Sequence, residues 1–470
     1  MPKVAIADGE IQYEAASRGE PLAFVSSLGG TGSYWRPPVR AFGSRFLSGL
    51  EKEKARMVVE AAIVAVFFVV YLGMILGGLP FLQLDRTGVA LLGAIALVSI
   101  GALTLEEAWG AIHAPTLILL FAFMVISAQL RLGGFYTWVT WRLGALPLPP
   151  VGLLAALIAA IAVLSAVFSN DIICLAVAPV LVDVCLARRL NPVPFLLALA
   201  CAANVGSAAT LIGNPQNMLI GETLKLPFLG YIRDVAVPVT LGLAVTWAII
   251  AWQARGRWEL APGAGVAGGH APGEAPPPFD RWQSAKGIAV AGVVFVLFLF
   301  APLPREVVAL VAAGLLMTSR KLHSYKMLGL VDWQLLVLFI GLFVVNHGLA
   351  RTGLPQDTIR DLAAAGVDLA HPAPLFAAAF VLSNVVSNVP AVMLLLPAAT
   401  HGIAGPVLAL ASTFAGNLLI VGSIANIIVV GAAQRRAIHI GWKEHARVGV
   451  PVTLATMAIA AGWLWLRLHP

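Results

Sequence analysis

The sequence carries little charge for its length. Only 11% of its 470 residues are Asp, Glu, Lys or Arg, whereas 59% are hydrophobic and the mean hydropathy is +0.89. Soluble domains contain roughly a quarter of charged residues. So little charge excludes a soluble globular protein, and the apolar runs of helical length predict an all-α polytopic membrane protein surrounded by membrane lipid.

Signatures of catalysis and nucleotide binding are absent from the sequence. There is no G-x-S-x-G nucleophile elbow, no H-E-x-x-H and no Walker A motif. The 3 cysteines form neither a C-x-x-C pair nor a disulfide framework. We therefore predict that the protein is not an enzyme and has no cofactor, and that ATP is not used directly within this chain.

The basic residues are typical of membrane-protein loops. The formal net charge is +7, which reflects Lys and Arg in cytoplasmic loops, and no aromatic-interleaved basic patch indicates nucleic-acid binding. The N-terminus lacks the n-region, h-region and cleavage site of a signal peptide. We expect a multi-pass protein of the cell's inner (plasma) membrane.

One stretch inside the apolar sequence is unusually polar. Residues 169–217 open with SNDIICLAVAP and close with NVGSAATLIGNPQN. An unsatisfied amide or hydroxyl in hydrocarbon costs several kcal/mol, so a lipid-facing helix would not carry these groups. Gly206, Gly213 and Pro215 should also break the helix here. Broken helices with polar side chains at membrane depth are typical of the midplane site of a transporter.

The second half of the chain repeats this arrangement. SNVVSNVPAVMLLLP begins at Ser383, and ALASTFAGNLLIVGSIANIIVVG begins at Ala409. Aligning the halves places Arg86 opposite Arg305 and Asn217 opposite Asn426. The predicted units are an N-terminal appendage at 1–56, transporter repeat 1 at 57–254, a Gly/Pro-rich and mobile cytoplasmic linker at 255–285, and transporter repeat 2 at 286–470.

The apolar segments have the same order in both halves. They lie at about 58–79, 87–104, 114–130, 149–168, 171–187, 195–220 and 235–253, then at about 286–302, 305–318, 332–350, 373–387, 389–400, 404–430 and 447–467. Segments 149–168 and 171–187 have no room for a polar loop between them, which predicts a re-entrant hairpin with its tip at 169–171. The counterpart tip is at 387–389. Each repeat would then contain about five transmembrane helices plus one hairpin, and an odd number of spans inverts the two repeats.

The appendage differs from the rest of the chain. KVAIADGEIQYEAA and PLAFVSSLGG alternate like strands, and this stretch resembles the opening strands of an α/β-hydrolase. The resemblance covers only about 40 residues and no nucleophile elbow follows. We therefore predict a non-catalytic, hydrolase-like fragment.

The motifs SND at Ser169, NVGSAATLIGNPQN ending at Asn217, VVSNVPAV at Val385 and AGNLLIVGSIAN ending at Asn426 together resemble an ion-transporter superfamily. Its members include ArsB/NhaD-type permeases, YbiR-like anion permeases and divalent-anion/sodium symporters. The resemblance spans roughly residues 57–470. It implies an inverted-repeat carrier with two hairpins, which forms a homodimer and moves its transport region like an elevator.

The resemblance also implies the site. Hard cations such as Na+ prefer oxygen ligands, which hairpin tips and unwound helices supply. We expect the coupling ion, Na+ or H+, at Ser169, Asn170, Asp171, Gly213, Asn214, Ser387, Asn388, Gly422 and Ser423, with no other metal. We expect the substrate, a small inorganic anion or metalloid, at Asn170, Asn388, Asn217, Asn426 and Ser387. The alternative is that these groups only cap helix breaks and bridge helices.

Asp171 makes the site electrostatically asymmetric, because its counterpart is Val389. A carboxylate at membrane depth is costly and is usually functional. We favour Asp171 as a ligand of the coupling ion or a proton acceptor, with a helix N-cap as the alternative. Dicarboxylate symporters commonly carry Thr at this position. A fixed negative charge beside a dianion site weakens binding, so this departure favours small inorganic species such as arsenite.

The sequence therefore predicts an ion-coupled secondary active transporter for a small inorganic oxyanion or arsenite, working by alternating access. Sodium-coupled di- or tricarboxylate symport and Na+/H+ antiport share the same scaffold and remain alternatives. A passive channel is a further alternative. Duplicated hairpins and broken helices favour an alternating-access carrier over such a channel.

Overall fold

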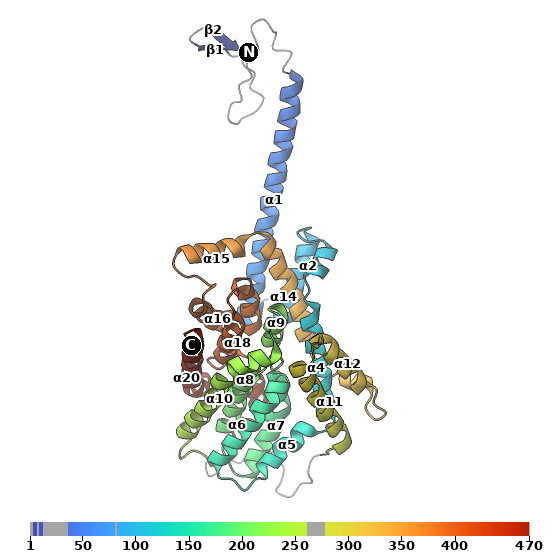
Figure 1. Cartoon of the computed structure of the whole chain (residues 1–470), viewed down its shortest axis with the longest axis vertical. Coiled ribbons are helices and arrows are strands. Elements are labelled where there is room, and N and C mark those ends of the chain that lie inside the picture. Colours follow the sequence, from blue (N-terminus) through green and yellow to red (C-terminus); the bar gives the residue numbers. More distant parts are fainter. Residues whose placement is uncertain (1–2, 7–8, 13–35, 80–81, 261–277, 470) are drawn as a thin grey trace.

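The computed structural model describes residues 3–6, 9–12, 36–79, 82–260 and 278–469, with side chains from residue 56 onward. Apart from two short strand pairs, the described elements are helices (Figure 1). Eight helices in the described part are long and apolar enough to cross a membrane. The protein is thus a mostly helical, polytopic membrane protein, as predicted.

The helices of the first half follow one another with short connections. They are α1 (Arg36–Leu76), α2 (Arg86–Ser99), α3 (Leu105–Gly110), α4 (Ala114–Leu132), α5 (Phe135–Gly144), α6 (Pro150–Val167), α7 (Asn170–Ala187), α8 (Pro192–Ser207), α9 (Pro215–Thr223) and α10 (Phe228–Gln253). The strands are β1 (Lys3–Ile6) and β2 (Gly9–Gln12), which pair antiparallel, and β3 (Gly78–Leu79) and β4 (Leu84–Asp85), which do the same.

The second half contains the same succession of long, short and broken helices. They are α11 (Arg281–Phe300), α12 (Arg305–Met317), α13 (Ser324–Leu328), α14 (Trp333–Arg351), α15 (Leu354–Ala364), α16 (Pro372–Val386), α17 (Asn388–Leu395), η2 (Leu396–Ala398), α18 (Ala404–Ala415), η3 (Ile420–Gly422), α19 (Ile424–Gln434) and α20 (Trp442–Leu468). Even the turn before α5 recurs before α15: Gly134 (φ 75°) and Gly353 (φ 78°) both adopt the left-handed conformation that glycine permits.

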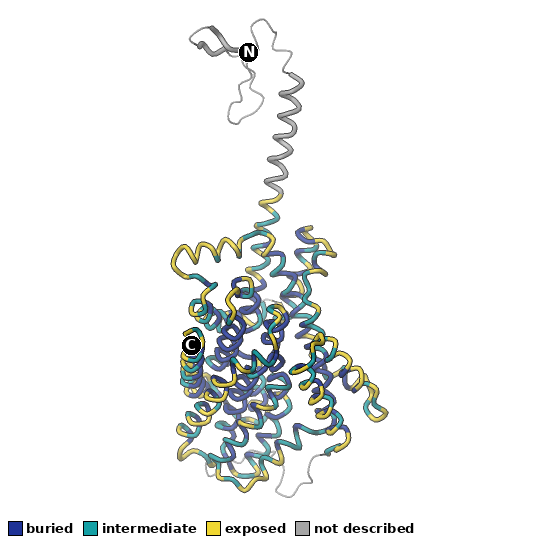
Figure 2. The backbone as a smooth tube through the Cα atoms, viewed as in Figure 1, coloured by how far each residue is buried: buried dark blue, intermediate teal, exposed yellow. Residues whose placement is uncertain are grey.

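Packing between the halves is reciprocal. Helix α2 packs on α14 and α12 packs on α4, while α10 packs on α20. Within the halves, α6 packs on α8 and α16 on α18. The interior of the bundle is buried (Figure 2), and every residue of α18 is buried. Most residues of the segment 204–217 also lie inside the protein, whereas Val385, Val421 and Ile424 of the second-half motifs are exposed.

The central helices α4 and α14 run antiparallel. The ring of His113, at the start of α4, lies 6.2 Å from that of Phe343, and the ring of Phe121 lies 6.0 Å from that of Trp333, at the start of α14. The short helices that follow them, α5 and α15, lie at opposite ends of the bundle (Figure 1). The chain therefore leaves α4 and α14 at opposite ends of the bundle.

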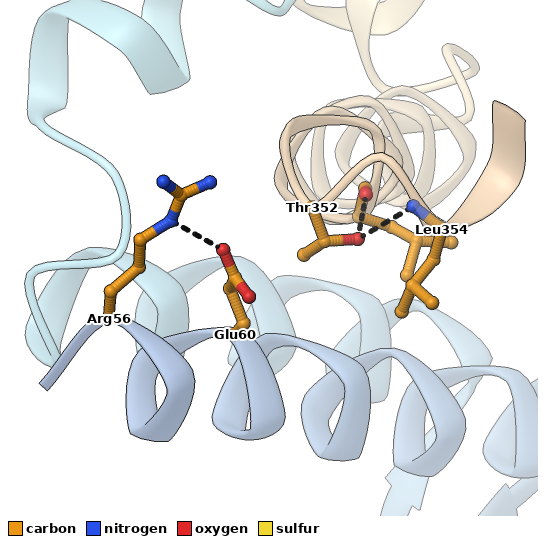
Figure 3. A network of polar contacts seen from close by, with 5 residues as sticks. Arg56, Glu60, Thr352 and Leu354 are labelled. Atoms are coloured by element: carbon orange, nitrogen blue, oxygen red, sulfur yellow. Dashed lines mark hydrogen bonds and ion pairs between the residues drawn. The ribbon is translucent and has the colours of Figure 1, made fainter. Parts of the chain in front are cut away.

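The end of α14 meets the start of the apolar part of α1. Here Arg56 Nε contacts Glu60 Oε1 at 2.8 Å, and Thr352 Oγ1 accepts from the backbone N–H of Leu354 (Figure 3). Arg351 pairs with Glu107 at 2.8 Å. The pair of Arg351 and Glu107 joins α14 to α3. Beside it lies a cavity of about 440 Å³, lined by α1, the connection between α2 and α3, and the end of α14.

Several helix ends differ from the bounds of the predicted units. Helix α1 begins at Arg36, well inside the predicted appendage, and α11 begins at Arg281 inside the predicted linker, where Asp280 caps it. The sequence also gave no expectation of α3, α5, α13 and α15. The start of the linker is packed, since the N–H of Asn191 donates to the carbonyl of Trp258. The SLGG loop (27–30) and linker residues 261–277 lie outside the described residues.

Candidate functional site

Four helix breaks meet in the interior, at the positions that the sequence predicts. Helix α6 gives way to α7 at Ser169, and α16 gives way to α17 at Ser387. The other two breaks separate α8 from α9 and α18 from α19. Ser387 has φ 79°, which is strained for a residue with a Cβ and is typical of functional turns.

The first tip is attached to the break between α8 and α9. The N–H of Asn170 donates to the carbonyl of Gly213 at 3.1 Å, and Asn170 Nδ2 donates to Asn204 Oδ1 at 3.0 Å. A Cβ at Gly213 would lie 2.2 Å from the carbonyl oxygen of Ser207, so only glycine fits. The structure therefore brings the predicted residues Asn170 and Gly213 together.

Asn204 lies at the centre of an amide network that joins the two halves. Its Oδ1 accepts from Asn170 and, at 2.9 Å, from Ser423 Oγ. Its Nδ2 donates to Asn417 Oδ1 at 2.9 Å and to Asn426 Oδ1 at 3.2 Å. The sequence marked Asn204 as polar but not as a site residue, and Asn417 was missed. Their position in broken helices was the available signal.

A second link between the halves involves Asn214. Its Nδ2 donates to Thr413 Oγ1 at 3.2 Å and to Ser207 Oγ at 3.0 Å. Gln216 Nε2 also reaches Thr413 Oγ1, at 3.4 Å. Asn214 additionally accepts from the N–H of Asn217 and so caps α9. The predicted coupling-ion residue Asn214 is therefore a helix cap and a link to the other half.

Asn217 and Asn426 each brace the break of their own half. Asn217 Nδ2 donates to the carbonyls of Ser207 and Thr210, and Asn426 Nδ2 donates to those of Gly416 and Leu419. These carbonyls lose their helical partners at the break. The two amide nitrogens are thus used by the protein itself, and the substrate role of these residues stays a prediction.

Several buried oxygen atoms around the breaks have no hydrogen-bond partner in the described part of the chain. They are Ser165 Oγ, Asn170 Oδ1, Asn217 Oδ1, Ser383 Oγ, Asn384 Oδ1 and Asn388 Oδ1. Buried polar atoms without a partner are rare and call for a ligand or other explanation. All six are neutral oxygens, which is the donor set that a hard cation prefers.

Ser165 and Ser383 were missed by the sequence analysis. Each lies four residues before the tip serine, Ser169 or Ser387, so helical periodicity places it on the face of the tip. Asn384 also faces the second break, because its Oδ1 lies 3.4 Å from where a Cβ on Gly422 would be. These three oxygens extend the predicted set toward the ends of α6 and α16.

Asp171 reaches across to the other half. Its carboxylate accepts a hydrogen bond from the backbone N–H of Ala425, in the first turn of α19. Asp171 is only partly buried. A carboxylate at a helix N-terminus is stabilised by the unpaired N–H groups and the dipole. Both roles considered for Asp171, the coupling role and the helix cap, therefore stay predictions.

Residues 69–415 match the citrate transporter family (CitMHS). The chain belongs to this family. An uncharacterized transporter of Mycobacterium tuberculosis is 30% identical over 412 residues, which cover 82% of this chain and 94% of the relative. The silicon efflux transporter LSI3 of Oryza sativa subsp. japonica is 28% identical over 463 residues, 84% of this chain and 95% of that protein. The inner membrane protein YbiR of Escherichia coli is 27% identical over 370 residues, covering 77% and 91%.

These relationships make the protein a transporter and not an enzyme, as the sequence predicts. The YbiR relative agrees with the YbiR-like part of the predicted resemblance. No group of three or more His, Cys, Asp or Glu side chains suited to a metal occurs in the described part of this transporter. Any cation at the breaks would therefore be held mainly by neutral oxygens.

The last helix of each half of this transporter supports the break of that half. Tyr231, in the first turn of α10, donates its OH to the carbonyl of Ala208 at 2.8 Å. His445, in the first turn of α20, contacts the carbonyl of Asn417 through Nε2 at 3.1 Å. Ala208 and Asn417 occupy the same position in the aligned repeats. The two breaks are thus held by equivalent contacts from different side chains.

Proposed function

We propose that the protein is an ion-coupled secondary active transporter that moves a small inorganic oxyanion, or an uncharged inorganic hydroxide such as arsenite, by alternating access. The observation that supports this most is the meeting of four helix breaks around a buried amide network contributed by both halves. Irregular backbone at membrane depth is tolerated only where it is buried or lines a path.

The proposal includes an inverted repeat with one re-entrant hairpin in each half. Its support is the antiparallel course of α4 and α14, the reciprocal packing of α2 on α14 and α12 on α4, and the location of α5 and α15 at opposite ends (Figure 1). By length alone α6 and α7 could each cross a membrane, whereas α16 and α17 are shorter. The hairpin assignment for α6 and α7 therefore rests on the equivalence of the halves.

The coupling ion, Na+ or H+, would be co-transported. In the first half we assign it Ser165, Ser169, Asn170 and Asp171, with the backbone at Gly213. In the second half we assign it Ser383, Asn384, Ser387 and Asn388, with the backbone at Gly422. The unpartnered oxygens of Ser165, Asn170, Ser383, Asn384 and Asn388 support this assignment. Asn214 and Ser423 would hold the breaks that present these oxygens.

The substrate would lie between the two tips, near Asn170, Asn388 and Ser387. The network on the described side chains contains amides and hydroxyls but no Lys or Arg, and Asp171 is the nearest ionisable side chain in α7. Such a site suits an uncharged hydroxide better than a multivalent carboxylate, because Asp171 would repel negative charge. The relative named as a silicon efflux transporter supports this class, and the family name supports citrate as the competing substrate.

We further propose a homodimer in the inner (plasma) membrane, in line with the E. coli relative named as an inner membrane protein. The substrate class is tested by thermal unfolding of the purified protein with arsenite, silicic acid, phosphate, sulfate, citrate and succinate, each with and without Na+ and at two pH values. A ligand that binds the folded state raises Tm by mass action. Stabilisation by arsenite or silicic acid supports the proposal. Stabilisation by citrate or succinate only with Na+ would replace it with carboxylate symport.

A further inference from the structure

The guanidinium of Arg86 forms no ion pair with any residue that the structure describes. Arg86 is the first residue of α2, its Nε is buried, and that atom has no hydrogen-bond partner in the described part of the chain. The neighbouring Asp85 forms no ion pair with it in the described part of the chain, and Asp85 Oδ1 instead accepts from the N–H of Gly88 at 2.8 Å and caps α2. Arg86 as a whole is only half-buried, but a buried nitrogen without a partner calls for an explanation.

The equivalent residue in the second half shows what a partner looks like. Arg305 is the first residue of α12, and its Nε contacts Glu222 Oε1 at 3.0 Å. Its Nη2 donates to the carbonyl of Gly221 at 3.2 Å. The side chain of Glu222 is only 4% exposed and that of Arg305 only 14% exposed. Here the protein supplies its own carboxylate to the buried guanidinium.

The second half has no carboxylate at the position that aligns with Glu222. The register that aligns Gly213 with Gly422, and Asn217 with Asn426, aligns Glu222 with Gly431. Only Arg435 Nη1 comes within 4 Å of where a Cβ on Gly431 would be, at 3.8 Å. At this position the second half therefore has no carboxylate, and the nearest side chain is basic.

The two arginines also lie toward opposite ends of the molecule. Thr87 Oγ1 donates to the carbonyl of Gln334 at 3.3 Å, which places Arg86 beside the start of α14. Arg305 lies on α12, which packs on α4, and its neighbour Glu306 acts electrostatically on His113 at the start of α4. Because α4 and α14 run antiparallel, Arg305 and Arg86 lie toward different ends of the helix bundle.

We propose that Arg86 binds an anionic ligand of the phosphate or sulfate class through its guanidinium. The planar fork of donors on Arg matches two oxygens of such an anion, and charge-assisted pairs of this kind are the strong ones. A small soluble oxyanion and the phosphate of an anionic phospholipid headgroup share this chemistry, and basic sites between transmembrane helices hold headgroups. The site is separate from the amide network at the helix breaks.

The soluble anion is tested on the full-length protein, purified in detergent and depleted of lipid. Tm is measured against inorganic phosphate and sulfate for the wild type, Arg86→Gln, Arg86→Lys and the matched control Glu222→Gln/Arg305→Gln, which removes the paired counterpart. We expect Arg86→Gln to weaken the anion response by about tenfold or more, Arg86→Lys to weaken it less, and the control to retain it.

The lipid source is tested by native mass spectrometry after incubation with vesicles of phosphatidylglycerol and phosphatidylethanolamine. Retention of phosphatidylglycerol by the wild type and Arg86→Lys, with loss in Arg86→Gln, supports the site with a lipid headgroup as its ligand. If Arg86→Gln does not fold, Arg86→Lys must still show weaker binding than the wild type. Equal binding of both probes by the wild type and the Arg86 variants, or binding of neither probe by the wild type, would overturn the proposal.

One further variant separates this site from the proposed transport site. Asn170→Ala/Asn388→Ala removes two amides at the helix tips and should retain the part of the phosphate response that Arg86→Gln abolishes. Loss of the response in that variant, with the response intact in Arg86→Gln, would assign the anion to the tips and refute the role of Arg86. Failure of transport would not affect this result, because binding is measured without transport.

Discussion

Asn214 donates a hydrogen bond to Thr413 at 3.2 Å, and the same bond recurs with the halves exchanged, where Ser423 donates to Asn204 at 2.9 Å. Asn214 precedes α9 and contacts α18 of the other half. Ser423 precedes α19 and contacts α8 in the same way. These bonds hold the two breaks together, so a displacement of one break requires a displacement of the other.

Removal of the unpartnered hydroxyls at Ser165 and Ser383 should separate stability from ion binding. Ser165→Ala and Ser383→Ala delete buried oxygens that make no described hydrogen bond. Without Na+, the free energy of unfolding should stay the same or rise by up to about 1 kcal/mol, because an unsatisfied polar atom is removed. The rise of Tm with Na+ should largely disappear.

The matched control for these variants is Ser412→Ala. Ser412 is also a buried helical serine, but its Oγ donates to the carbonyl of Leu408 at 2.6 Å. This variant should keep the Na+ response. An unchanged Na+ response in both Ser165→Ala and Ser383→Ala would remove these residues from the proposed ion sites.

Loss of the Asn204 side chain should destabilise the protein strongly. Asn204→Ala removes four hydrogen bonds and leaves Asn170, Asn417 and Ser423 with buried groups in need of partners. We expect a loss of about 2–4 kcal/mol in the free energy of unfolding. Thr413 occupies the position of Asn204 in the other half and makes fewer hydrogen bonds with its side chain. Thr413→Val should therefore lower the free energy of unfolding by less. Equal unfolding midpoints for the two variants and the wild type would show that the network does not hold the halves together.

Asp171→Asn should abolish the dependence of transport on the ion gradient while the protein remains folded. Asn retains an oxygen that accepts from the N–H of Ala425, so the cap of α19 is kept although the charge is lost. Asp171→Ala loses both and should lower Tm as well. Transport by Asp171→Asn that keeps the pH and Na+ dependence of the wild type would restrict Asp171 to a capping role.

His113 should make stability depend on pH. Burial, with Lys225 acting in the same direction and Glu306 opposing, lowers the pKa of His113 below its usual 6.5. Between the lowered pKa and the unfolded value the unfolded chain binds more protons, so stability falls as the pH drops through this window and is fully recovered above the unfolded pKa. His113→Gln should flatten this part of a Tm against pH curve. A slope identical to that of the wild type would contradict this origin.

The helix breaks could be predicted because they violate the expected pattern. Gly213 with Pro215 interrupts a helical run. Ser169 begins the polar triplet Ser-Asn-Asp and Ser387 begins the polar pair Ser-Asn, both inside apolar sequence, and hydrocarbon does not tolerate such groups. The repetition of these features also identified the two halves. Such breaks depend mainly on the local sequence. The backbone N–H and C=O groups that a break frees need hydrogen-bond partners wherever the segment lies.

Other parts of the fold depend on contacts that the sequence does not display. Ser165 is a single hydroxyl in an apolar run, and Ser383 is followed by Asn384. Local sequence cannot distinguish either serine from helix-bonded serines such as Ser412. The central role of Asn204 arises from partners up to 222 residues away. Helix α1 was placed too late in the chain because its first part, from Arg36, is not apolar. Length and burial of such segments are decided by the surrounding structure.

The central claim, ion-coupled alternating access, is tested most directly by flux into proteoliposomes that contain the purified protein. With arsenite or silicic acid we predict saturable uptake that depends on a Na+ or H+ gradient, and counterflow when unlabelled substrate is loaded inside, because a carrier exposes its site to one side at a time. Asp171→Asn should lose the gradient dependence. Flux that does not saturate, shows no counterflow and ignores both gradients would contradict the account and indicate a passive channel.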